Sequence, residues 1–107
     1  MDIQLRKGLL ELCVLASLRE KDSYGYQIIK DISDYIDISE STLYPILRRL
    51  EADGKVESYN TEYNNRIRKY YKMTDTGRQT LKDFSADKET LLRVFDFIEG
   101  GDADDEG

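Results

Sequence analysis

Apolar residues along the first half of the chain recur every three or four positions, which is the period of an amphipathic helix. The pattern predicts three helices, over residues 3–19, about 23–35 and 39–53. Ser23 and Ser39 are suitable N-caps for the second and third helices, and Gly54 is a suitable stop after the third. The stripe on the first helix is wider than one contact requires, so we expect this helix to bury two faces.

The period changes to two over residues 56–73, which predicts two β-strands. Asn64 and Asn65 separate the strands, and asparagine tolerates the left-handed backbone conformation that a tight hairpin turn requires. Thr74 can cap a last helix, because helical spacing returns after it. The apolar positions of this helix are Leu81, Phe84, Leu91, Phe95 and Ile98, with Lys88 in the one polar slot.

This order of elements predicts a mainly α fold with a small β-hairpin, namely a winged helix-turn-helix followed by a long C-terminal helix. We expect the winged helix-turn-helix over residues 1–76, a dimerisation helix over 77–99 and a disordered acidic tail over 100–107. A hairpin of two short strands is only marginally stable alone, so it must lean on the third helix.

Charge and composition exclude several classes of function. The chain has no histidine, the commonest general base and metal ligand, and it shows no paired carboxylates or phosphate-binding loop. We therefore expect no enzyme, no cofactor and no metal site. No segment resembles a membrane span or a signal peptide, so we expect a cytoplasmic protein that does not bind membranes. Cys13 lies in an apolar run, which favours a buried thiol.

The net charge of −6 comes entirely from the C-terminal part. Residues 1–80 carry 13 Lys and Arg against 13 Asp and Glu, whereas residues 81–107 carry 3 against 9. Residues 66–72 contain four cations and no acid, so the acidic balance does not exclude a basic face that binds nucleic acid.

The side of the third helix opposite its apolar stripe is small, polar and basic, which suits a helix that enters the major groove. Its candidate DNA contacts are Ser41, Thr42, Tyr44, Pro45, Arg48 and Arg49. We expect Thr42, Tyr44 and Arg48 to approach bases. Pro45 is the only proline, and the helix tolerates it because it lies on the exposed side. The alternative is that Arg48 and Arg49 only solvate this face and that Tyr44 packs against a neighbour.

The predicted hairpin carries a second basic cluster next to that helix. Arg66, Arg68 and Lys69 are candidates for phosphate contacts, and Asn64 and Asn65 lie beside them. Tyr26, at the start of the second helix, is a further candidate, because a helix N-terminus suits a phosphate, although packing explains it equally well. The alternative for the hairpin is a solvated edge strand protected by its cations.

Three blocks of sequence resemble the PadR family of bacterial transcriptional regulators. They are Gly-Tyr-Gln-Ile at residues 25–28, Ser-Thr-Leu-Tyr-Pro-Ile-Leu-Arg-Arg-Leu-Glu at 41–51 with Gly54, and Arg-Lys-Tyr-Tyr-Lys-Met-Thr-Asp-Thr-Gly at 68–77. The resemblance covers about residues 5–81. It implies a winged-helix homodimer that binds double-stranded DNA at an inverted-repeat operator and represses transcription until a small-molecule effector lowers its DNA affinity.

The resemblance also implies the short type of this family, in which one C-terminal helix packs on the first and last helices of the partner. The corresponding interface residues here are Leu5, Leu9, Leu81, Phe84, Lys88, Leu91, Leu92, Phe95 and Ile98. Lys88 lies about where some relatives carry the tryptophan of a drug-binding pore, and the absence of tryptophan argues against such a pore here. The alternative function is a winged-helix module that binds a protein partner and has no sequence preference for DNA.

Overall fold

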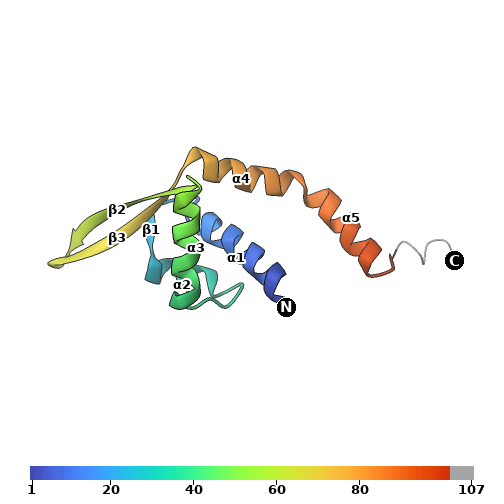
Figure 1. Cartoon of the computed structure of the whole chain (residues 1–107), viewed down its shortest axis with the longest axis horizontal. Helices are drawn as coiled ribbons and strands as arrows, with labels where there is room; N and C mark the ends of the chain where they lie inside the picture. The colour runs from blue at the N-terminus through green and yellow to red at the C-terminus, as the bar shows by residue number, and fades with distance from the viewer. Residues whose placement is uncertain (102–107) are drawn as a thin grey trace.

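The computed structural model describes residues 1–101 and contains five helices and three strands within that range (Figure 1). In chain order they are α1 (Ile3–Ser17), β1 (Ser23–Tyr24), α2 (Gly25–Ile32), α3 (Glu40–Ala52), β2 (Val56–Tyr63), β3 (Arg66–Met73), α4 (Asp75–Ala86) and α5 (Lys88–Ile98). The predicted fold, mainly α with a small hairpin, is confirmed. Residues 102–107 of the expected acidic tail lie outside the described range.

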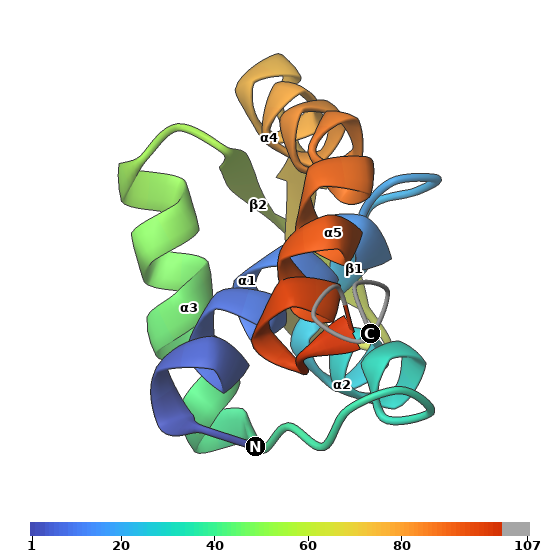
Figure 2. The same cartoon turned by 90° about the vertical axis from the view of Figure 1, so that its right-hand side faces the viewer.

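The core lies where the first three helices meet the base of the hairpin. Helix α1 packs against α2, α3 and α4, as its broad apolar stripe predicts, and Figure 2 shows α3 along one side of it. The buried side chains are Leu10, Val14, Leu15 and Leu18 near or in α1, Ile28 and Ile32 in α2, Leu43, Ile46, Leu47 and Leu50 in α3, and Val56, Tyr71, Met73 and Leu81 beyond. Every position of the apolar stripe predicted for α3 is therefore buried.

A third strand replaces the predicted start of the second helix. Ser23 pairs with Tyr71 and Tyr24 with Tyr70, so the sheet has the order β1-β3-β2 and is antiparallel. Ser23 is therefore a strand residue and not an N-cap, and α2 begins at Gly25 and ends at Ile32. The ladder with β3 explains the difference, because it draws these two residues into extended backbone.

The predicted hairpin turn and the predicted cap of α4 are both present. Asn64 and Asn65 have φ values of 51° and 62°, the left-handed conformation that a two-residue hairpin turn needs. The Thr74 hydroxyl accepts a hydrogen bond from the Gly77 N–H (3.1 Å) and donates one to the Gly54 carbonyl (2.6 Å). Thr74 therefore connects the end of α3 to the start of α4.

The segment expected to form one long C-terminal helix is two consecutive helices. Asp87 ends α4 and precedes α5, with φ −88° and ψ 1°. Helix α4 packs against α1, whereas none of the residues of α5 is buried, and α5 leads away from the rest of the molecule (Figure 1). We call α4 and α5 together the arm, and the longest dimension of the structure is 67 Å. None of the helices in residues 1–101 is long and apolar enough to cross a membrane.

Candidate nucleic-acid interface

A hollow of about 850 Å³ lies between the distal half of the hairpin and the first turns of α2 and α3. Six of its lining residues are among the predicted DNA contacts: Tyr26, Tyr44, Asn64, Arg66, Arg68 and Lys69. The other five are Tyr24, Glu40, Tyr63, Ile67 and Tyr71. Three segments that are separated in sequence therefore meet at one surface, which is rich in hydroxyl groups and cations.

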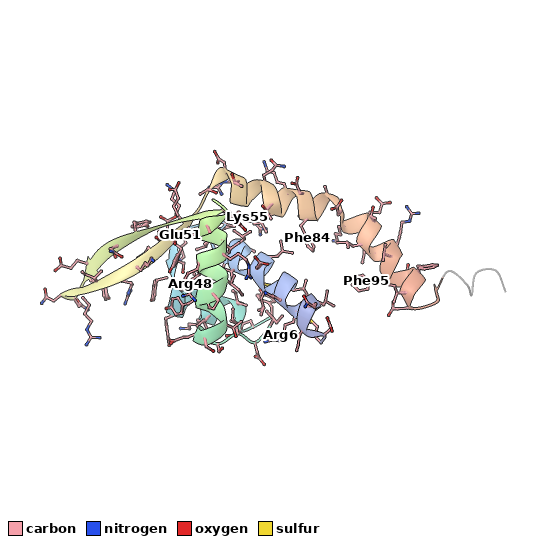
Figure 3. The ribbon with its side chains drawn as sticks, viewed as in Figure 1. Arg6, Arg48, Glu51, Lys55, Phe84 and Phe95 are labelled. Carbon is pink, nitrogen blue, oxygen red and sulfur yellow. The ribbon has the colours of Figure 1, made fainter. Side chains whose placement is uncertain are left out.

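The exposed side of α3 adds four predicted contacts to this surface. Ser41, Thr42, Pro45 and Arg48 are all exposed. Ser41, Pro45 and Arg48 lie opposite the buried stripe of the same helix, and Thr42 lies on the flank toward α1. The Ser39 hydroxyl shares hydrogen bonds with the hydroxyls of Ser41 (3.0 Å) and Thr42 (3.2 Å). These contacts gather three hydroxyl groups at the first turn of α3, while Arg48 lies one to two turns further along the exposed side (Figure 3).

The hairpin is attached to α3 near its base. The Ser58 hydroxyl of β2 donates a hydrogen bond to Glu51 of α3 (2.6 Å). Tyr71 of β3 is buried next to the core, and this burial raises the pKa of its hydroxyl, with Tyr44 and Glu51 adding to the effect and Arg48 opposing it. Tyr71 is therefore neutral at physiological pH. It lines the hollow on the side next to the core.

The three predicted phosphate contacts of the hairpin lie on two faces. Arg66 and Arg68 lie opposite Tyr63 and Thr61 in the register and share one face, whereas Lys69, opposite Asn60, lies on the other. The Arg68 guanidinium lies between the rings of Tyr24 (4.1 Å) and Tyr63 (4.6 Å). Strand β1 pairs only with Tyr70 and Tyr71 of β3, so residues 66–69 have no strand beside them on that edge within residues 1–101. Side chains from both faces of the hairpin reach the hollow along this edge.

Arg49 lies apart from the hollow. Its Nε is 3.0 Å from Glu11 Oε1 of α1, and both side chains are partly buried. Arg49 also lines a second hollow, of about 400 Å³, between α1 and α3, together with Thr42 and Pro45. The structure therefore joins Arg49 to the helix packing, while Arg48, the next residue back, is exposed.

The other five lining residues were not among the predicted DNA contacts, and different features of the fold bring them to the hollow. Tyr24 reaches the hollow because β1 pairs with β3, and Tyr63 does so because it lies opposite Arg66 at the end of the hairpin. For the three tyrosines among the five, Tyr24, Tyr63 and Tyr71, the signal in the sequence is only the frequency of tyrosine, 8 residues in 107. On the face of the hairpin that carries Arg66 and Arg68, the Tyr59 hydroxyl donates a hydrogen bond to Asp22 (2.5 Å), which further orders that face.

The residues expected at a dimer interface lie on the side of the arm that faces α1 or on α1 itself. Leu9, Leu81 and Phe84 line a hollow of about 290 Å³ between α1 and α4, and Figure 3 shows Phe84 and Phe95 pointing to the same side of the arm. Leu91 is half-buried, and the other expected residues are exposed: Leu5, Lys88, Leu92, Phe95 and Ile98. Within residues 1–101, the exposed members of this set therefore form a mostly apolar surface on the arm, with Lys88 as its charged residue.

Among residues 1–101, no three histidine, cysteine or acidic side chains gather as a metal site would require. Cys13 is partly buried, and this burial raises the pKa of its thiol, so the thiol is protonated and unreactive at neutral pH.

Known proteins are similar to this chain both in sequence and in fold. Residues 14–83 match the transcriptional regulator PadR-like family. The transcriptional regulator Rv3488 of Mycobacterium tuberculosis is 30% identical over 91 residues, which cover 84% of this chain and 85% of that protein. The crystal structure of a PadR family transcriptional regulator from Eggerthella lenta is 37% identical with a TM-score of 0.79, covering 90% of this chain and 86% of that one.

The comparisons also include a structure with bound nucleic acid. The crystal structure of Bacillus subtilis PadR in complex with operator DNA is 27% identical with a TM-score of 0.65, and the match covers 71% of this chain and 45% of that one. The family match alone, over residues 14–83, spans more than half of the chain. The chain therefore belongs to the PadR-like family of transcriptional regulators, a family of regulators and not of enzymes.

Proposed function

We propose that the chain is a sequence-specific DNA-binding repressor. The observation that carries this proposal is the meeting of α2, α3 and the hairpin around one hollow that is rich in hydroxyl groups and cations. A helix with short polar residues at its first turn and an arginine further along suits the major groove. The Bacillus subtilis relative that was crystallised in complex with operator DNA supports a DNA-binding role.

The contacts divide into two kinds. Thr42, Tyr44 and Arg48 of α3 approach base edges, where an arginine pairs bidentately with guanine. The hairpin and the start of α2 contact phosphates and fix the orientation of α3, with contributions from Tyr26, Asn64, Asn65, Arg66, Arg68 and Lys69. Local cations are sufficient for this, because residues 1–80 carry as many Lys and Arg as Asp and Glu, and the acidic excess begins only after residue 80 of the sequence.

We propose that the DNA-binding species is a homodimer. The exposed apolar side chains of the arm pack against the α5 helix of a second copy. Burial of each large apolar side chain there contributes about 1.5–3 kcal/mol to the free energy of association. A two-fold dimer presents two copies of α3, so its operator is an inverted repeat with half-sites about one helical turn apart. Occupation of a promoter by such a dimer represses transcription, and a small-molecule effector that favours another arrangement of the dimer releases it.

Salt titration tests the phosphate contacts. Binding of the chain to its own promoter region should weaken steeply from low to physiological salt, because each neutralised phosphate releases counterions. Arg66→Ala is expected to reduce the slope of log K against log salt by about one unit. Lys30→Ala, which removes one cation at the opposite end of α2, is the matched control and should leave the slope unchanged. An unchanged slope in Arg66→Ala would contradict the role of the hairpin.

Selection of bound sites from random DNA tests the base contacts. The proposal predicts recovery of a short inverted repeat, and Arg48→Ala should relax the preference at one position of each half-site. Recovery of DNA without any common sequence would instead favour a winged-helix module that binds a protein partner.

A further inference from the structure

The junction between β1 and α2, residues Tyr24 and Gly25, contacts both parts of the candidate interface. Gly25 is the first residue of α2 and is buried, while Tyr24 ends β1 and pairs with Tyr70 of the hairpin. Gly25 lies against the Tyr44 side chain of α3, and the Tyr24 ring contacts Arg68 in the distal half of the hairpin. These contacts position the junction between the base-reading helix and the phosphate-binding hairpin.

The contact with α3 requires the absence of a side chain at residue 25. A Cβ atom added to Gly25 would lie 2.4 Å from the Tyr44 hydroxyl oxygen and 3.0 Å from Cζ of the same ring. Both distances are shorter than a van der Waals contact, so any other residue displaces the ring. The backbone of Gly25 does not have a positive φ, so the requirement is for space and not for a special conformation. Tyr44 is 39% exposed, with its ring resting on the first turn of α2.

The contact with the hairpin orders a long cationic side chain. The Arg68 guanidinium carbon is 4.1 Å from the centre of the Tyr24 ring and 4.6 Å from that of Tyr63. Rings at this distance from a guanidinium attract the cation and leave the N–H donors in its plane available to a phosphate. The Tyr24 ring also lies 5.4 Å from the Tyr70 ring, so it is itself held in place.

We propose that Tyr24 and Gly25 are positioning residues that fix Tyr44 and Arg68 relative to each other, so that α3 and the hairpin meet DNA as one preorganised surface. The proposal rests on the proposed DNA-binding function. Its physical basis is that side chains already ordered in the free protein lose less conformational freedom when they bind. The junction does not itself need to contact DNA for this effect.

The hairpin contact is tested with two substitutions that differ in the aromatic ring. Tyr24→Leu removes the ring and retains apolar bulk, and we expect a salt slope reduced by about one unit, with a roughly tenfold loss of affinity at physiological salt. Tyr24→Phe retains the ring and is expected to restore most of both. Tyr35→Leu, a matched substitution at an exposed tyrosine outside the interface, should change neither. Thermal unfolding of each variant separates this effect from loss of the fold.

The contact with α3 is tested by a double-mutant cycle. Gly25→Ala is expected to reduce affinity for the selected operator about tenfold while leaving the salt slope unchanged, because it displaces a base contact and not a phosphate contact. In the Tyr44→Phe background the same substitution should cost less, because the hydroxyl that lies 2.4 Å from the added methyl is gone. Equal costs in both backgrounds would overturn the role of Gly25.

A measurement without DNA separates this inference from the proposed function. In nuclear magnetic resonance spectra, the Nε–Hε signal of Arg68 should be displaced by the adjacent rings in the wild-type chain and in Tyr24→Phe, and should approach the value of a free arginine in Tyr24→Leu. An undisplaced wild-type signal, or a salt slope unchanged in Tyr24→Leu, would overturn the inference alone. A wild-type chain that binds no DNA would overturn the proposed function, and the inference with it.

Discussion

Two glycines inside helices have opposite surroundings, and these predict opposite effects of an added methyl group. A Cβ atom at Gly77 of α4 would lie 2.3 Å from the Lys55 carbonyl oxygen, and a backbone atom cannot move aside cheaply. We expect Gly77→Ala to lower the free energy of unfolding by about 1–3 kcal/mol, measured by urea denaturation at a fixed chain concentration.

Gly8 in α1 is the matched control for that substitution. Apart from the neighbouring backbone of α1 itself, no atom of residues 1–101 lies within 4 Å of the position of its Cβ. Gly8→Ala should therefore raise the free energy of unfolding by about 0.5–1 kcal/mol through the higher helix propensity of alanine. If both variants were equally stable, the close packing of α4 against the start of β2 would be contradicted.

Among the elements, the hairpin is the one whose stability we expect to depend most on a single turn. Asn64 and Asn65 both adopt positive φ, which costs a residue with an ordinary side chain about 1–2 kcal/mol and glycine nothing. We therefore expect Asn65→Gly to stabilise the hairpin and Asn65→Ala to destabilise it by about 1 kcal/mol. Hydrogen exchange of the β2 and β3 amides reports this locally, and identical protection in both variants would be inconsistent with the turn.

Elements whose signals are local were predictable from the sequence, and those that depend on distant contacts were not. The turn at Asn64 and the cap at Thr74 are formed by neighbouring residues, so their positions were correct. Strand β1 has two residues and exists only through pairing with β3, almost fifty positions later. The break at Asp87 was hidden because the apolar spacing continues across it.

The same distinction applies to the candidate interface. Arg48 and Arg49 are adjacent, and a helical wheel places both near the exposed side of α3. The two residues differ because Arg49 forms an ion pair with Glu11, 38 residues away in the sequence, and so joins α3 to α1. Arg48 has no such contact in the described residues and is exposed. The cationic character of the hairpin and the position of the adjacent Arg68 and Lys69 on opposite faces were predictable from strand alternation. That both side chains nevertheless reach the hollow required the path of β3.

At the scale of the whole molecule, the exposed apolar side chains of α5 predict that two copies of the chain associate. Phe95 is 51% exposed on the side of α5 that also carries Leu91 and Leu92, so Phe95→Glu should convert a micromolar dimer into a monomer in light scattering. Phe97→Glu is the matched control, because two residues turn the helix by more than half a turn, and this variant should remain dimeric. A monomeric wild-type chain would contradict the proposed interface.

The one-residue joint at Asp87 gives this elongated molecule the properties of a lever. The hollow and α5 lie toward opposite ends of a structure 67 Å long, and the joint separates the part that would hold a second copy from the part that would read DNA. A rotation of a few degrees at such a joint moves α3 by a distance comparable to one base-pair step, about 3.4 Å. In the dimer that we propose, the angle at Asp87 would therefore set which half-site spacings can be bound.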